Sequence, residues 1–98
     1  MKAFSNTAVK ELLSVKLKNW SFDGTYISRI FKFNNFVNAF SFMTSVALEA
    51  EKMDHHPDWT NIYNSVTIKL NSHDAKGITQ QDFDLAQAID RLFERCKN

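Results

Sequence analysis

The spacing of the apolar residues changes along the chain, and this change limits the possible folds most strongly. From Phe36 to Met53 the apolar residues recur with the period of an α-helix. Pro57, the single proline, pushes His56 into extended backbone, so this helix must end before it. The sequence therefore predicts one long amphipathic helix, which Asn34 or Asn35 can cap. Its apolar stripe comprises Phe36, Phe40, Met43, Ala47 and Ala50. Three further apolar residues lie beside this stripe: Phe42, Val46 and Met53.

The segments on both sides of this helix alternate with the period of two that is typical of β-strands. Residues 20–22 and 26–33 flank Asp23-Gly24, a strong hairpin signal because glycine tolerates the positive φ of a tight turn. Residues 59–63 and 66–71 form a second pair, and the residues between them fit either a turn or a bulge. The alternation in the last strand predicts a sheet with one buried face. That face is formed by Val66, Ile68 and Leu70.

Two further helices complete the pattern. Residues 6–15 carry an apolar stripe, and Thr79 opens a last helix with Asp82 three positions on, the spacing of a capping box. The order is helix-strand-strand-helix-strand-strand-helix. This order favours an α+β fold, in which three helices pack on one face of a four-stranded antiparallel sheet. The buried side of the last helix comprises Phe83, Ala86, Ile89, Leu92, Phe93 and Cys96.

The composition limits the classes of partner. The 98 residues fit a single domain, 1–98, and 44% hydrophobic with 23% charged residues is typical of a soluble globular protein. A net charge of +1 does not favour nucleic acid or a membrane surface as a partner. No stretch approaches the roughly 20 apolar residues of a membrane span, and MKAFSNTAVK lacks the apolar run of a secretory signal. With Cys96 as the single cysteine, we expect no intrachain disulfide and a reducing compartment.

The length of the chain also favours self-association. A chain of 98 residues buries a modest fraction of its surface, while nine Phe and two Trp are many large side chains for a thin α+β layer to cover. The edges of the sheet offer a place where a second copy can pair. We therefore expect a homodimer or a homotetramer.

All three histidines lie near the ends of predicted elements. His55 and His56 follow the long helix, and His73 lies 18 positions after His55, at the end of the fourth strand. A hairpin between them would return His73 to the level of the pair. The C-terminus of a helix and neighbouring carboxylates both favour a protonated imidazole, which can donate a proton to a leaving hydroxyl. The carboxylates near the histidines are Glu51, Asp54, Asp58 and Asp74.

Simpler explanations of the same residues stay open at this point. A His-His pair before proline is usually a polar turn, and three histidines can also hold a zinc ion with a water. The HxH and HExxH spacings of metal sites are absent, however, and adjacent histidines in extended backbone point in different directions. Trp59 fits a core position or a stacking surface, Asp82 a helix cap, and Glu51 a solvated helix end.

Longer motifs connect these residues to a known family. EKMDHHPDW, NIYNSVTIKLNSHDAKGIT and DFDLA occur in this order, and W-x-F-x-x-x-x-I-S-R-x-F precedes them at Trp20 to Phe31. The chain thereby resembles the pterin-4a-carbinolamine dehydratase family from about Phe36 to Leu92. The resemblance implies a four-stranded antiparallel sheet with helices packed on one side.

The resemblance also implies a reaction. Family members dehydrate 4a-hydroxytetrahydrobiopterin to quinonoid dihydropterin and water, which recycles the tetrahydrobiopterin cofactor of aromatic amino acid hydroxylases. They need no metal and no cofactor of their own. We expect a cytoplasmic protein, with the nucleus as the alternative location.

Residue by residue, the resemblance assigns catalytic roles to His55, His56 and His73. The residues that match His55 and His73 act as general acids toward the two faces of the substrate, and the one that matches His56 mainly binds. Many relatives carry arginine where this chain has Gln81, which calls into question any ion pair at this position. The supporting, substrate-binding positions of the family match Glu51, Asp54, Trp59 and Asp82.

The family also includes binding modules. Some animal members serve as dimerisation cofactors of a homeodomain transcription factor, a role in which the outer helices matter and the histidine pocket does not. Family members form dimers by joining their sheets, and the animal forms pair these dimers through helices. The alternatives to the enzyme are therefore a module that binds a transcription factor and, from the histidines alone, a small zinc hydrolase.

Overall fold

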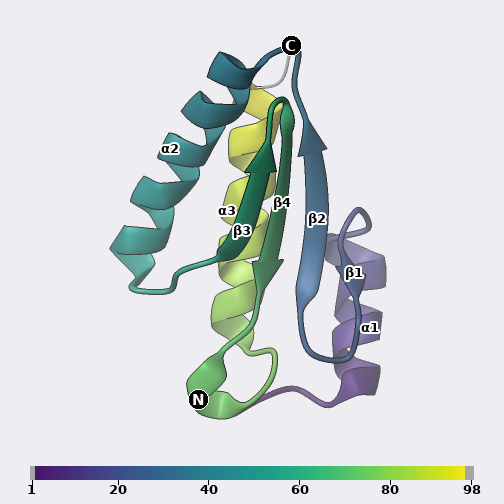
Figure 1. Cartoon of the computed structure of the whole chain (residues 1–98). Coiled ribbons are helices and arrows are strands. Elements are labelled where there is room, and N and C mark those ends of the chain that lie inside the picture. Colours follow the sequence, from purple (N-terminus) through teal and green to yellow (C-terminus); the bar gives the residue numbers. More distant parts are fainter. Residues whose placement is uncertain (1, 97–98) are drawn as a thin grey trace.

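The chain folds into one antiparallel sheet whose single buried face is covered by helices (Figure 1). The computed structural model describes residues 2–96. The predicted α+β class and the predicted order of helices and strands are confirmed, and no helix of the described residues is long and apolar enough to cross a membrane. The elements are α1 (Asn6–Lys16), β1 (Ser21–Phe22), β2 (Ile27–Lys32), α2 (Phe36–Met53), β3 (Asp58–Ile62), β4 (Ser65–Leu70), the short 3-10 helix η1 (His73–Ala75) and α3 (Gln80–Cys96).

The sheet has the strand order β1-β2-β4-β3, and all neighbouring strands are antiparallel. Phe31 pairs with Val66 and Ile27 with Leu70, which brings these side chains onto the same face. All four are buried, as the alternation predicts, whereas Ile30 on the opposite face is exposed. The helices therefore bury one face of the sheet and leave the other open.

The first hairpin has a longer loop than a tight two-residue turn. Because Phe22 pairs with Ile27, four residues form the loop, and the Asp23 carboxylate accepts the backbone N–H groups of Thr25 and Tyr26 at 2.8 and 2.7 Å. The positive φ expected at Gly24 is present, at +97°. β1 is shorter than predicted because it begins only at Ser21, after Trp20.

The second hairpin contains a turn and not a bulge. Ile62 pairs directly with Ser65, so Tyr63 and Asn64 form a two-residue connection, with Tyr63 at φ 50°. β3 and β4 consequently begin and end one residue earlier than the alternation predicts.

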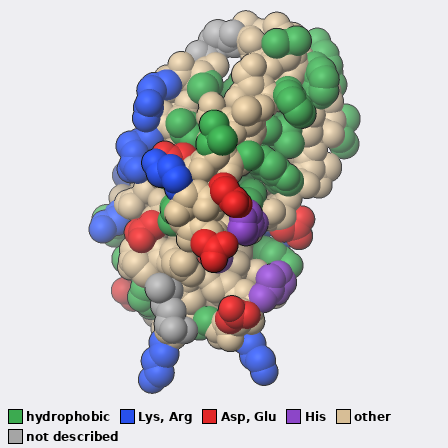
Figure 2. Space-filling model, turned by 90° about the vertical axis from the view of Figure 1, so that its left-hand side faces the viewer, with side chains coloured by type: hydrophobic (Ala, Val, Ile, Leu, Met, Phe, Trp, Pro, Cys, Tyr) green, Lys and Arg blue, Asp and Glu red, His purple; other side chains and the backbone are tan. Residues whose placement is uncertain are grey.

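The bounds of α2 are as predicted, but its buried stripe is only partly right. The buried residues are Ala39, Phe42, Val46 and Ala50, whereas Phe36 and Phe40 are 48% and 55% exposed. The helix is apolar on more than one side, and periodicity alone cannot decide which side meets the sheet. Figure 2 is viewed from the side on which α2 lies in Figure 1, and it shows hydrophobic side chains gathered on the upper part of this face. The large exposed apolar residues of α2 are Phe36, Val37, Phe40 and Leu48.

The cap of α3 departs from the predicted capping box. Asp82 Oδ2 accepts the backbone N–H of Thr79 at 2.8 Å, which is one half of the box. The Thr79 hydroxyl lies instead 2.8 Å from Ser72 Oγ, so it does not cap the helix. Asp82 is therefore tied to the end of β4 as well as to its own helix.

Candidate active site

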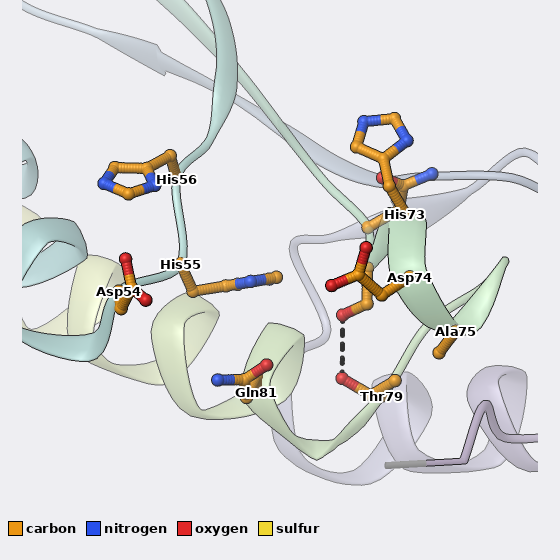
Figure 3. A pocket seen from close by; sticks show the side chains of 10 residues that line it. Asp54, His55, His56, His73, Asp74, Ala75, Thr79 and Gln81 are labelled. Atoms are coloured by element: carbon orange, nitrogen blue, oxygen red, sulfur yellow. Dashed lines mark hydrogen bonds between the residues drawn. The ribbon is translucent and has the colours of Figure 1, made fainter.

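The three histidines line one pocket of about 520 Å³ (Figure 3). His55 and His56 come from the link between α2 and β3, and His73 comes from η1 on the opposite side. The β3–β4 hairpin carries the chain out and back, as the sequence predicts, although β4 ends at Leu70 and His73 lies three residues beyond it. The lining residues are Asp54, His55, His56, Asn71, Ser72, His73, Asp74, Ala75, Thr79 and Gln81.

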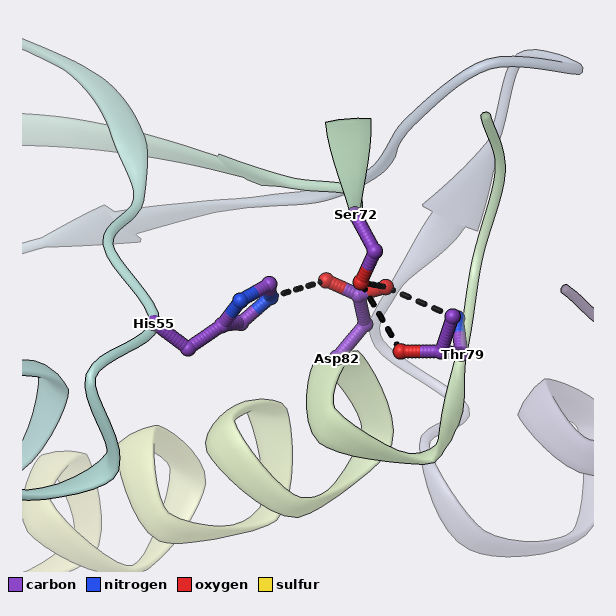
Figure 4. A network of polar contacts seen from close by, with 4 residues as sticks. All are labelled: His55, Ser72, Thr79 and Asp82. Carbon is purple, nitrogen blue, oxygen red and sulfur yellow. Dashed lines mark hydrogen bonds and ion pairs between the residues drawn. The ribbon is translucent and has the colours of Figure 1, made fainter. Parts of the chain in front are cut away.

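The end of α2 fixes His55. Asp54 adopts the left-handed conformation, with φ 51°, that commonly terminates helices, and the backbone N–H of His55 donates to the Ala50 carbonyl at 3.1 Å. The His55 ring is mostly buried, and its Nε2 lies 2.6 Å from Asp82 Oδ1. Both the backbone and the ring of His55 are therefore held, and Figure 4 shows the ring directed at Asp82.

His56 lies in a more open position. Its Nε2 is 2.8 Å from Glu51 Oε1, and both side chains are largely exposed. A solvent-exposed pair of this kind contributes little to stability and is easily rearranged. His56 is therefore less constrained than His55 and can adjust to a ligand at the rim of the pocket.

His73 stands on a small closed loop. The backbone N–H of Ser72 donates to the Gly77 carbonyl at 2.8 Å, and Gly77 donates back to Ser72 at 3.3 Å. A Cβ at Gly77 would lie 2.9 Å from the Cβ of Ala3, so the passage of the N-terminal segment requires glycine here. The His73 side chain is exposed and makes no hydrogen bond within residues 2–96. Its position is thus set by the loop backbone and not by a partner on its ring.

Asp82 lies behind His55 and does not line the pocket. The residue is fully buried, and its Oδ2 accepts both the Ser72 hydroxyl and the Thr79 backbone N–H at 2.8 Å (Figure 4). A helix cap alone therefore does not explain Asp82, because it also binds His55 and Ser72. This arrangement leaves Asp82 in contact with the protein on both carboxylate oxygens.

The other predicted binding residues take different places. Asp54 lines the pocket, and Glu51 contacts His56 at its rim. Trp59 pairs with Ile68 in the sheet, packs against the core and is absent from the pocket lining. Their contacts with a substrate stay predictions. Gln81 does line the pocket, so the departure from the family pattern falls in the wall of the site.

Ser72 lies within the NSHDAKG part of the family motif, but no role was predicted for it from the sequence. It follows Val66, Ile68 and Leu70 in the period of two, which places position 72 on the buried face of β4's continuation. A polar residue at such a position needs a hydrogen-bond partner. A polar residue at a buried position was the signal in the sequence that Ser72 has a specific partner. The partners themselves, Thr79 and Asp82, are identified only by the folded structure.

The arrangement is suited to proton transfer to and from a ligand in the pocket. Imidazoles stand on two sides of one pocket, and one of them is held by a buried carboxylate. Imidazole can donate or accept a proton near neutral pH. Among residues 2–96, no group of three or more His, Cys, Asp or Glu side chains is placed to hold a metal ion.

Comparison with known proteins decides the family. The family model described as Pterin 4 alpha carbinolamine dehydratase matches residues 2–92. The chain belongs to the pterin-4a-carbinolamine dehydratase family. The resemblance to this family that the sequence motifs indicate is thereby confirmed.

Individual dehydratase relatives cover nearly the whole chain. A protein of Rhizobium johnstonii, assigned by name to the pterin-4-alpha-carbinolamine dehydratases, is 47% identical over 97% of this chain and 95% of its own. A relative of Prochlorococcus marinus with the same assignment is 56% identical over 79% of this chain and 81% of its own.

Solved structures share the dehydratase fold. The crystal structure of a transcriptional coactivator/pterin dehydratase from Brucella melitensis has a TM-score of 0.87 and 39% identity, and covers 93% of this chain and 98% of that one. A pterin dehydratase-like protein described as a RuBisCO assembly factor in the alpha-carboxysome has a TM-score of 0.63 over 76% of this chain and 86% of that one. At 17% identity, the second likeness shows the fold alone.

Proposed function

We propose that this protein dehydrates 4a-hydroxytetrahydrobiopterin to quinonoid dihydropterin and water by histidine acid-base catalysis. The observation that carries the proposal is the placement of His55 and His73 on opposite sides of one pocket, in a chain of the dehydratase family. The reaction would recycle the tetrahydrobiopterin that aromatic amino acid hydroxylases consume. We place the enzyme in the cytoplasm and assign it no metal and no cofactor of its own.

The chemistry requires one proton donor and one proton acceptor. As the C4a–O bond breaks, the lone pair of N5 converts the N5–C4a single bond to a double bond, and a proton from an acid converts the departing hydroxide to water. The proton on N5 then moves to a base, which leaves the neutral product. General acid-base catalysis of this kind contributes about 10²–10⁴-fold.

His55 and His73 are assigned these two tasks. Each can act as the acid toward a hydroxyl on its own face of the pterin, and the neutral imidazole of the pair can accept the proton from N5. Asp82 holds the His55 ring in place, because its buried carboxylate lies 2.6 Å from His55 Nε2. Solvent restores the starting protonation, since the His73 side is open.

The remaining residues bind the substrate in this proposal. His56, which is exposed and paired with Glu51, can turn toward the pterin at the rim of the pocket. Asp54 lines the pocket and offers a carboxylate to the N–H groups of the pterin ring. Trp59 and Asp82 support the site from the core side, where they hold β3 and His55 in place.

The decisive experiment is a stopped-flow assay with 4a-hydroxytetrahydropterin that a hydroxylase generates in the same solution. The expected result is a decay of the carbinolamine that accelerates in proportion to the concentration of this protein. A decay rate equal to the spontaneous one, with folded protein present, would reject the proposed activity.

A second candidate function is a protein-binding module, such as a dimerisation cofactor of a homeodomain transcription factor. The observation that favours it is the apolar outer face of α2, where Phe40 and Leu48 are exposed, together with the coactivator named in the Brucella structure. A pull-down that compares the wild type with Phe40→Glu and Leu48→Glu would separate the roles. A binding module loses its partner in these variants, while the dehydration rate stays unchanged.

A further inference from the structure

We propose that Ser72 is a positioning residue that holds His55 and His73 at their working separation, with Thr79 acting through it. This inference rests on the proposed function, because it concerns the two histidines assigned to proton transfer. Ser72 is buried just beyond the last residue of β4, and its hydroxyl lies 2.8 Å from both Asp82 Oδ2 and Thr79 Oγ1 (Figure 4).

The hydrogen bonds around Ser72 run in one direction. A serine hydroxyl has one hydrogen, and the Ser72 hydroxyl donates it to the Asp82 carboxylate. The contact between Thr79 and Ser72 is then possible only if the Thr79 hydroxyl donates to Ser72 Oγ. The chain of donors therefore runs from Thr79 through Ser72 to Asp82. Successive hydrogen bonds with one direction polarise each other, which favours negative charge on the last acceptor.

This chain of hydrogen bonds holds the carboxylate that contacts His55. Asp82 Oδ2 accepts two donors, the Ser72 hydroxyl and the Thr79 backbone N–H. Asp82 Oδ1 lies 2.6 Å from Nε2 of His55, and we assign Nε2 as the donor in this contact. Within residues 2–96 the other ring nitrogen, Nδ1, has no hydrogen-bond partner. We therefore assign Nδ1 as the atom of His55 that exchanges a proton with the pterin.

Ser72 also holds the opposite side of the pocket. Its backbone pairs with Gly77 in both directions and closes the loop on which His73, the next residue, stands. The same residue thus contacts the carboxylate behind His55 through its side chain and supports His73 through its backbone. Removal of the hydroxyl breaks the first link and leaves the second, so the effect should fall mainly on His55.

The test combines imidazole NMR with kinetics on the full chain. Ser72→Ala and Thr79→Val remove the two hydroxyls, and Ser72→Thr and Thr79→Ser keep them. Ser14→Ala, on the exposed side of α1 and remote from the pocket, is the matched control for the loss of a serine hydroxyl. His56 provides an internal reference, because its ring pairs with Glu51 and not with this chain.

In Ser72→Ala, we expect the Nε2 proton signal of His55 to shift or to exchange faster, while the signals of His56 stay in place. We expect kcat to fall about tenfold with little change in KM, the loss that follows from removing one hydrogen bond to a charged group. Thr79→Val should change the same two quantities in the same direction by less. Ser72→Thr and Thr79→Ser should restore both.

The NMR result does not depend on the reaction, so the two proposals can fail separately. If the His55 signals in both Ser72→Ala and Thr79→Val, folded by their melting curves, match those of the wild type, the positioning role is wrong even when dehydration is fast. If the wild type does not dehydrate the carbinolamine but the His55 signals shift as expected, the proposed function fails and the linkage from Ser72 to His55 stands. If Ser72→Ala unfolds, the positioning role is tested by the His55 signals of Thr79→Val, which should shift, and of Ser72→Thr and Thr79→Ser, which should match the wild type.

Discussion

The Thr79 hydroxyl lies 2.8 Å from Ser72 Oγ and does not cap α3, although the spacing of Thr79 and Asp82 is that of a capping box. Only the reciprocal bond, from the Thr79 backbone N–H to Asp82, is present. The side chain thus links the start of α3 to the end of β4. Asp82 lies on α3, and His73 follows Ser72. The contact between the Thr79 and Ser72 hydroxyls therefore connects the segment that carries Asp82 with the segment that carries His73.

Thr79→Ala should lower the free energy of unfolding by roughly 1 kcal/mol, the usual net value of a buried hydrogen bond. The loss arises from the link to Ser72 and not from a lost cap. Denaturant melts measure it, and Thr79→Ser, which keeps the hydroxyl, should remain near the wild type. A Thr79→Ala protein as stable as the wild type would show that the Ser72 link contributes nothing.

The Asp23 turn should make stability depend on acid pH. The backbone N–H of Tyr26, and then that of Thr25, lower the pKa of Asp23 below its ordinary value. A lowered pKa means that the carboxylate stabilises the fold above the pKa of the unfolded chain, about 3.9, and that this contribution is lost as the pH falls through the folded value.

Asp23→Ala should therefore be less stable than the wild type near neutral pH, and the difference should shrink at pH values well below about 3.9. Thermal melts at the two pH values provide the measurement, with Glu11→Ala on the exposed side of α1 as the control for loss of a carboxylate. A difference that stays constant across this range would contradict a role for the charged form.

The sequence predicts most of the fold because its period changes are clear. The alternation of Val66, Ile68 and Leu70 sets the buried face of β4, and the bounds of α2 follow from its helical period and from Pro57. The buried side of α2 was less predictable, since Phe36 and Phe40 are as apolar as Phe42 and only the packed sheet decides between them.

The site was predictable in part for a similar reason. His55, His56 and His73 lie in recognisable motifs, and a hairpin between them explains why they share a pocket. The role of Asp82 behind His55, and that of Ser72 behind Asp82, depend on side-chain contacts between residues that are 27 and 10 positions apart. Spacing alone does not reveal such contacts.

The purified protein should contain no stoichiometric metal. The motive is that acid-base chemistry and substrate binding account for all three histidines and that the HxH and HExxH spacings are absent. Elemental analysis of the purified protein, followed by assay after treatment with a chelator, provides the test. One tightly held zinc per chain, with activity lost on chelation, would contradict the proposed mechanism and favour a zinc hydrolase.

The protein should form a homodimer or a homotetramer. β3 is an edge strand of the sheet, and the outer face of α2 exposes Phe40 and Leu48, so two surfaces are available for further copies. Sedimentation equilibrium at micromolar concentration measures the assembly. A single species at the monomer mass of 11.4 kDa would contradict self-association, and a clean dimer would exclude only the tetramer.

If α2 joins two dimers, Leu48→Glu should convert a tetramer to a dimer while the dehydration rate per chain is unchanged. Lys10→Glu on the exposed side of α1 is the matched control for a new surface carboxylate. A tetramer that persists in Leu48→Glu would place the contact between dimers elsewhere.

The central claim is that His55 and His73 transfer the protons of the dehydration, and the rate of carbinolamine decay in histidine variants tests it most directly. His55→Ala and His73→Ala should each lower kcat by about 10²-fold or more, whereas His56→Ala should mainly raise KM, since general acid-base groups contribute about 10²–10⁴-fold. The double variant of His55 and His73 should approach the spontaneous rate. A folded double variant that dehydrates the carbinolamine as fast as the wild type would contradict the account.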